Sequence, residues 1–299
     1  FENNYEYKNM FDNLEDSLSL TRELFPELLR LSTLDDYKDR VLDLLVMLVD
    51  SGFVNQKTYE SYFPGIYIDA RVLLKKQKSR DEKQLRSERK KDEDDNDPIR
   101  LYDVGNKTTN LQNYAILLIP YFHNDKNVQH FFEGLLDSRD DMVKLNTAIL
   151  MIRNQIPVAD SLLLSLASND KYRSVLYRKL DKLNKLSLFP VQYMSQNAMA
   201  KSILQKQSDY NKLDSVSFLS REKASIKGKT GFVYFYKYRL KKTDQWKIGI
   251  SGLQPLQEQE VSTDDQVSAM TDVRLKENEP LDEQLHKQLR KILFGFHKS

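Results

Sequence analysis

The side chains that most often carry out catalysis or bind metals are few in this sequence of 299 residues. It has no cysteine, which excludes disulfides, thiol nucleophiles and cysteine-bound zinc. The four histidines are His123, His130, His286 and His297. No two of them have the spacing of a zinc-protease helix, with a glutamate after the first. We therefore predict no metal site, although His123 and His130 could approach one another across a turn.

Pairs of adjacent aspartates could supply a general acid and a general base. Outside the acidic run 92–97, the pairs are Asp35-Asp36, Asp140-Asp141 and Asp264-Asp265. Each stands where a helix is expected to begin, and an aspartate there accepts hydrogen bonds from free backbone N–H groups. Thr263 and Gln266 also have the spacing of a capping box. We interpret the pairs as helix caps.

Gly228-Lys229-Thr230 resembles the end of a phosphate-binding loop. Neither Lys223 nor Ala224 supplies the first glycine of such a loop, and the residues that follow predict a strand, so no helix N-terminus is offered to a phosphate. The motif therefore predicts a turn. We assign no catalytic, cofactor-binding or metal-binding residue, and we expect no cofactor.

The elements around these residues are mainly helical. Short breaks at 123–127, 138–141 and 154–157 contain Asn, Asp or Ser for helix caps, or Pro to end a helix. Between the breaks, apolar residues recur at helical spacing, which predicts antiparallel helices in sequence. The clearest stripes are Leu111, Ala115, Leu118 and Ile119; Val128, Phe131, Phe132, Leu135 and Leu136; and Met142, Leu145, Ala148, Ile149 and Ile152.

One unit of this pattern, residues 135–150, resembles a HEAT-type repeat. Paired leucines close one helix, aspartates follow in the turn, and Val143-Lys144 stands where the family has Val-Arg. The resemblance implies stacked helix pairs, an α-solenoid, because one helix pair cannot bury both of its apolar faces alone. An irregular helical bundle is the alternative, since it has the same periodicity with different connections.

The N-terminal part repeats this pattern loosely. Helices are expected over 18–31 and 37–49, with Gly52 ending the second, and Pro64 is expected as the first residue of another. From residue 75 the chain becomes almost wholly charged, and we interpret 75–110 as a linker or exposed insertion whose first part could extend that helix. The alternative is a docking segment for a charged partner.

The period changes after residue 213. Residues 232–240 and 246–251 are rich in β-branched and aromatic residues and predict a β-hairpin, to which 216–219 could add a strand. A helix is expected from near Pro280, covering one face of the sheet. Tyr234, Tyr236 and Tyr238 share one strand face, and with interleaved Lys and Arg they could stack on RNA bases. That nucleic-acid hypothesis is the less favoured one.

Residues 231–238, 246–249 and 252–255 resemble the C-terminal tail of large bacterial envelope proteins with a TraB/GumN-type domain upstream. The glycine-rich turn with His and Glu of that domain is absent. The resemblance implies a non-catalytic accessory region of an exported bacterial protein, in the envelope or periplasm. Because the sequence begins with Phe1, we also expect a piece of a larger protein.

Composition restricts the partners. Lys and Arg total 46 against 44 for Asp and Glu, so a net charge of +2 creates no field that would steer nucleic acid. The longest apolar run, 115–122, contains Pro120 and is shorter than the ~18 residues of a membrane span, so we expect no membrane insertion. A partner protein is expected instead, on a charged face that includes Lys144, Arg153 and Arg173.

Together these patterns predict a mostly α fold of HEAT-like antiparallel helix pairs, followed by a small α+β domain with an antiparallel hairpin. The predicted domains are 1–74, the charged 75–110, 111–212 and 213–299. The predicted function is a non-catalytic protein-interaction or scaffolding module. The alternatives are an accessory region of a hydrolase-type enzyme, using His123, His130 or the aspartate pairs, or a nucleic-acid-binding module.

Overall fold

The structure, a computed structural model, describes residues 11–32, 38–89, 110–206, 213–226, 228–265 and 267–296, with their side chains except in 83–89 and 292–296. The chain forms two compact units, Phe1–Pro157 and Val158–Ser299. The predicted fold class is confirmed, because the described part of the first unit is helical and the second unit adds an antiparallel sheet after its helices. Asp35-Asp36, His297 and the acidic run 92–97 lie outside the described residues.

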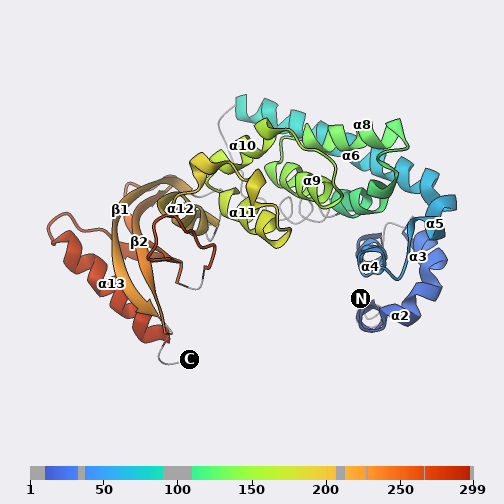
Figure 1. The fold of residues 1–299 in the computed structure, drawn as a ribbon. Coiled ribbons are helices and arrows are strands. Elements are labelled where there is room, and N and C mark those ends of the chain that lie inside the picture. The colour runs from blue at the N-terminus through green and yellow to red at the C-terminus, as the bar shows by residue number, and fades with distance from the viewer. Residues whose placement is uncertain are drawn as a thin grey trace, which may run out of the picture. The chain divides into compact units, whose positions relative to one another are not determined.

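The described part of the first unit is a succession of helices (Figure 1). Its elements are helices over 11–16 and 110–118, α2 (Leu18–Thr21), η1 (Arg22–Leu24), α3 (Phe25–Leu31), α4 (Lys38–Asp50), α5 (Gln56–Tyr59), η2 (Glu60–Tyr62), α6 (Phe63–Arg89), η3 (Ile119–Tyr121), α8 (Lys126–Leu136) and α9 (Asp141–Arg153). The predicted caps form at two of them. Asp125 accepts hydrogen bonds from the first N–H groups of α8, and Asp140 accepts one from Met142 of α9.

The core of the first unit contains a group of aromatic side chains. Tyr59 is fully buried, and its ring lies 5.9 Å from that of Phe25 and 6.1 Å from that of Tyr121. Its hydroxyl donates a hydrogen bond of 3.0 Å to the carbonyl of Leu117. The hydroxyl is thereby satisfied without water, as a buried polar group requires.

Helix α6 continues beyond the predicted start of the charged segment at Lys75. The expected extension of the helix is confirmed, and Lys75, Lys76 and Lys78 are exposed, but the expectation of exposure is wrong at Gln77 and Asp81, which are buried. The Asp81 carboxylate accepts hydrogen bonds from Gln77, from the hydroxyl of Ser138 and from the N–H of Arg139. A charged residue can therefore be buried here, because three donors compensate its lost hydration.

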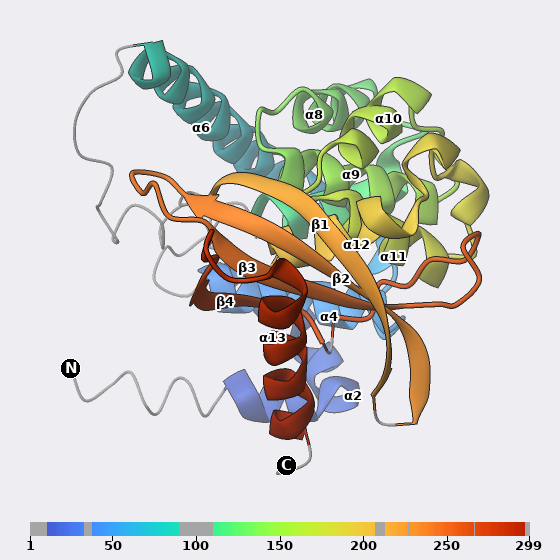
Figure 2. The same cartoon turned by 90° about the vertical axis from the view of Figure 1, so that its left-hand side faces the viewer.

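In the second unit, helices precede and follow a meander of strands (Figures 1 and 2). Its elements are α10 (Asp160–Ser168), α11 (Arg173–Lys182), η4 (Leu186–Leu188), η5 (Val191–Tyr193), α12 (Gln196–Lys206), β1 (Leu213–Ile226), β2 (Lys229–Leu240), β3 (Lys247–Gln254), β4 (Ala269–Arg274) and α13 (Leu281–Phe296). The four described strands lie in the order β1-β2-β3-β4, and each neighbouring pair is antiparallel. The predicted hairpin is confirmed as β2 and β3.

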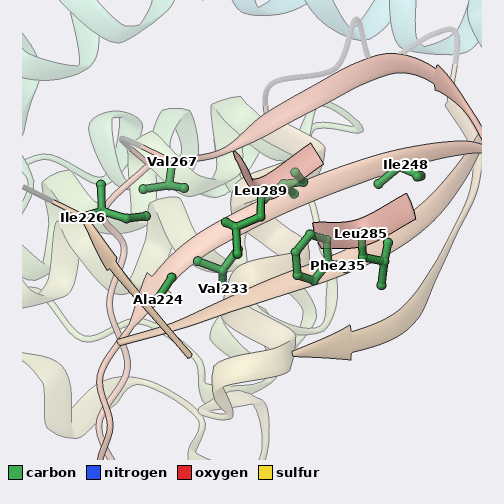
Figure 3. Close-up of a cluster of buried hydrophobic side chains, with 9 residues drawn as sticks. Ala224, Ile226, Val233, Phe235, Ile248, Val267, Leu285 and Leu289 are labelled. Atoms are coloured by element: carbon green, nitrogen blue, oxygen red, sulfur yellow. The ribbon is translucent and has the colours of Figure 1, made fainter. Parts of the chain in front are cut away.

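Helix α13 covers one face of the sheet. Figure 3 shows Leu285 and Leu289 of this helix against Phe235 and Val233 of β2. These side chains are buried together in one apolar cluster. The predicted C-terminal helix therefore supplies the apolar cover that a small sheet needs for stability.

The other face of the sheet is covered by α12. Tyr234 and Tyr236 of β2 form a second cluster with Ala200 and Leu204 of this helix. Gly249 of β3 lets α12 approach closely, since a Cβ at that position would lie 2.7 Å from Leu204 Cδ2. The sheet is thus sandwiched between two helices (Figure 1).

Helix α12 belongs to the same compact unit as the sheet, which differs from the domain boundary predicted from the sequence. The sequence pattern places a boundary at 212/213, between α12 and β1. In the structure the contacts divide the chain between Pro157 and Val158, so α10, α11 and α12 belong to the same compact unit as the sheet.

Among the described helices, none combines the length and apolar character needed to cross a bilayer.

Candidate interaction surface

The residues considered for catalysis do not form a common site in the described part of the chain. His130 bonds to the carbonyl of Lys126 within its own helix, and the ring of His123 lies edge-on to Phe122. His286 lies on α13, where its Nε2 is 3.4 Å from Glu222. Within the described residues, no three His, Asp or Glu side chains gather as a metal site would require.

The aspartate pairs have structural roles where they are described. Asp140 caps α9, and Asp141 lies 3.2 Å from Lys144 in an ion pair within that helix. Asp265 lies 3.4 Å from Lys206. The helix expected to begin near Thr263 does not form, and residues 261–265 run without helix or strand toward β4.

A buried glutamine explains the missing helix. The side chain of Gln254 donates to the carbonyl of Ser262 and accepts from its N–H, both at 2.8 Å. These two bonds fix the backbone where a helix would have to start.

Gly228 occupies a turn with φ +78°, and Thr230 follows at the start of β2, so the prediction of a turn rather than a phosphate loop is confirmed.

The tyrosines of β2 offer no exposed ring for stacking on bases. Tyr234, Tyr236 and Tyr238 are all buried, and their hydroxyls donate to Gln196, Asn197 and Thr271. The interleaved cations Lys237 and Arg239 lie over the ring of Trp246, at 4.7 and 5.2 Å from its centre. The hypothesis that this hairpin stacks on RNA through its tyrosines is therefore wrong, because α12 occupies that face.

Arg173 was expected on an exposed charged face, and the structure contradicts this. Its side chain is only 4% exposed. The guanidinium donates to the carbonyls of Ala167, Ser168 and Ala198, and it forms a 2.5 Å ion pair with Asp170. Lys144 and Arg153 lie nearer the surface, and each is paired with an aspartate 3.2 Å away.

A different set of cations reaches the surface of the second unit, where Lys182 is exposed and Arg178 and Lys179 are half-buried. Val175, Arg178, Lys179 and Lys182 have spacings of three and four residues in α11, which place them on one face of the helix. All four are at least partly exposed. Within the described residues, no carboxylate lies at ion-pair distance from the three cations.

The segment that follows α11 in the sequence exposes apolar side chains. Lys185 follows the end of α11, and Leu188 and Val191 are 39% and 77% exposed. We call Arg178, Lys179, Lys182, Lys185, Leu188 and Val191 the α11–η5 surface. Exposed apolar residues are common singly, so the unpaired cations of this surface are what make it a candidate for binding.

The backbone under this surface is held in fixed turns. The N–H of Lys185 donates to the carbonyl of Leu180, which ends α11 around Asn184 with its positive φ of 55°. Phe189 is buried, and its ring lies edge-on to Tyr177 at 5.2 Å. The N–H of Phe189 also donates to the carbonyl of Leu186. Leu188 and Val191 are therefore presented on either side of a buried anchor.

One lysine of this surface, Lys179, is destabilised in its charged form. The pKa of Lys179 is lowered from its ordinary value, first by burial and then by the neighbouring charges of Arg178 and Lys182. A lowered lysine pKa means that the protonated form is destabilised where it stands. A carboxylate brought to this face would offset the repulsion from Arg178 and Lys182, each of which is a smaller cause than burial.

The sequence contains a cluster of cations at this surface, which apolar periodicity does not reveal. Between residues 171 and 193, Asp181 is the only acidic residue among six Lys and Arg.

Comparisons with protein-family models, with curated proteins and with solved structures found no match to this chain.

Proposed function

We propose that this chain is a non-catalytic protein-interaction module, and that a partner protein binds at the α11–η5 surface. The observation that carries the proposal is a run of four cations without a carboxylate partner among the described residues, followed within six residues of the sequence by the exposed Leu188 and Val191. Covering apolar atoms and pairing these charges would both stabilise a complex.

The fixed backbone of the segment supports the same proposal. Binding is weakened when side chains and loops must be ordered in the complex. Here α11, η4 and η5 are already held by hydrogen bonds and by the buried Phe189. A partner would meet a surface whose backbone needs little ordering.

The resemblance of residues 135–150 to a HEAT-type repeat supports an interaction role as well. These residues form the end of α8 and most of α9, joined by a short turn that Asp140 and Asp81 stabilise. Stacked helix pairs of this kind present extended surfaces to partners. We propose on the same basis that the helical part is HEAT-like.

The resemblance to envelope proteins rests on segments of the sheet and not on the α11–η5 surface. Its segments lie in and just beyond β2 and β3, where side chains are buried on both faces of the sheet. Packing alone favours aromatic and β-branched residues at such positions. We therefore base the proposed function on the exposed residues of α11 and η5 instead.

A site-specific crosslinking experiment tests the proposal. A photoreactive amino acid replaces Val191 in cells that produce the protein, and a matched variant carries it at Lys287, which is exposed on α13. We expect a discrete crosslinked protein from position 191 only. That crosslink should disappear when Arg178 and Lys182 are both changed to Glu. Absence of a crosslink at 191, or equal products at both positions, would contradict the proposed site.

A further inference from the structure

We infer that the partner segment bound by the α11–η5 surface is an acidic amphipathic helix. Its carboxylates, spaced at i, i+4 and i+7, would face Arg178, Lys182 and Lys185, and an apolar side chain would contact Leu188 and Val191. This inference rests on the proposed function and names the chemistry of the partner.

The spacing of the cations favours a helical partner. Arg178 and Lys182 stand one helical turn apart, about 6 Å along the axis, and Lys185 follows in the turn that ends the helix. Glu residues four apart on a second helix have the same axial separation. A helix lying alongside α11 can therefore pair two carboxylates with Arg178 and Lys182 in one register, and a third carboxylate is directed to Lys185 in the turn beyond the helix.

The charges around the surface favour an acidic partner. Elsewhere in the second unit, several cations are neutralised within the chain: Lys201 by Asp170, Arg221 by Glu258 and Lys247 by Asp272. From 178 to 185 the formal charge is +3, from four cations and Asp181. The lowered pKa of Lys179 agrees with an unneutralised cluster. This surface is complementary to an acidic ligand.

The apolar residues and the aromatic rings decide between classes of anionic partner. Tyr177 packs against Phe189, and the ring of Tyr193 faces Arg173 at 5.4 Å. These rings are engaged within the unit, which disfavours base stacking. The large apolar side chains exposed in the segment after α11 are Leu188 and Val191, and that segment exposes no Trp or Phe for a lipid interface. An acidic helix with an apolar edge uses both features.

Binding of synthetic peptides to the full chain tests this inference. One helical peptide carries Glu at i, i+4 and i+7 with Leu on the same side; a second has Gln in place of Glu, and a third has the first composition in scrambled order. We expect only the first to bind, measured by fluorescence anisotropy. Its affinity should fall between about 0.1 M and about 1 M salt, as the Debye length decreases from about 10 to about 3 Å.

Charge reversal and charge swap connect the binding to the named residues. Arg178→Glu with Lys182→Glu should weaken binding about tenfold or more, which corresponds to about 1.4 kcal/mol. Lys287→Glu is the matched control and should leave the affinity unchanged. A peptide with Lys in place of Glu should bind the double variant and not the original protein. A misfolded variant could not show this restored binding.

Several outcomes would overturn the inference. The scrambled peptide could bind equally, or single-stranded DNA or anionic vesicles could bind more tightly through the same residues. If the crosslink at position 191 depends on Arg178 and Lys182 while the acidic peptide neither binds nor competes, the acidic helix is wrong and the interaction role stands. If that crosslink is also absent, the proposed function fails too.

Discussion

Arg173 shows how one buried cation can connect three helices. Its guanidinium reaches carbonyls at the end of α10 and in the first turn of α12, while the residue itself begins α11. Asp170 neutralises it and also pairs with Lys201 of α12 at 2.7 Å. The planar guanidinium, with its five donors, suits this arrangement better than a lysine would.

Replacing Arg173 should therefore be far more damaging than replacing an exposed arginine. We expect Arg173→Met to lower the free energy of unfolding by about 3 kcal/mol, because three backbone carbonyls lose their buried donor and the half-buried Asp170 loses one cation and keeps Lys201. Arg153→Met, which breaks an exposed pair with Asp50, should cost about 1 kcal/mol or less. Urea unfolding of the two variants measures the difference, and equal losses would contradict the structural role of Arg173.

A second prediction at the residue scale concerns alkaline pH. Burial, and then the nearby Asp272, raise the pKa of Tyr238 from 10.0 to about 12. A tyrosine with a raised pKa in the folded protein ionises first in the unfolded chain. Its contribution to stability is therefore full below pH 10 and is lost as the pH rises through about 12.

The change that tests this effect is Tyr238→Phe, which cannot ionise. We expect the free energy of unfolding of the original protein to fall more steeply between pH 10 and 12 than that of the variant. Urea titrations at a series of pH values measure both curves. Parallel curves would mean that Tyr238 is not the group responsible.

At the scale of elements, the contact between α12 and β3 depends on the absence of a side chain at Gly249. A methyl group there would clash with Leu204 of α12. We expect Gly249→Ala to destabilise the protein by about 1–3 kcal/mol through overpacking. Leu204→Ala alone should cost about 2–5 kcal/mol through the cavity it leaves.

The two substitutions should not be additive, because the smaller residue at 204 makes room for the methyl group at 249. A double-mutant cycle by urea unfolding should give a coupling energy of about 0.5–3 kcal/mol, with the double variant more stable than the sum predicts. Strict additivity would show that the two positions do not contact one another.

The elements that the sequence predicted well are those with local signals. Asp140 marks the start of α9, and the aromatic alternation of 232–240 marks β2. Strand β4 was missed because Ala269–Arg274 is short and mixes apolar, polar and charged residues without a β-rich run. Only 216–219 of β1 were predicted, since Ser and charged residues fill much of the rest. These strands are specified by pairing with β2 and β3, which no local pattern reports.

The candidate surface was not predicted for a related reason. A cation in a sequence carries no sign of whether it will be buried, and Arg173 and Arg178 are both arginines of the same helix. Their difference arises from the carbonyls and the carboxylate of neighbouring elements. The sequence shows Lys and Arg clustered around the single Asp181. Which of these cations reach the surface is known only from the structure.

At the scale of the whole molecule, the two compact units give a prediction about local opening. Hydrogen exchange reports cooperative groups of residues whose stability can differ within one chain. Destabilising the second unit by Arg173→Met should speed amide exchange in α10–α12 and in β2 and β3. Amides of α4, α8 and α9 should exchange at unchanged rates. Mass spectrometry of exchanged peptides measures both groups, and a uniform increase would indicate one cooperative unit.

The side chain of Gln196 has a consequence for how this sequence can evolve. Its amide donates to the carbonyls of Pro255, Gln257 and Glu260, while its oxygen accepts from Tyr234. It therefore holds the loop after β3 through backbone atoms, which every residue type provides. Substitutions among the exposed side chains of 256–260 leave those carbonyls in place. Descendants of this sequence should keep glutamine at 196 while that loop changes freely, including at Leu256.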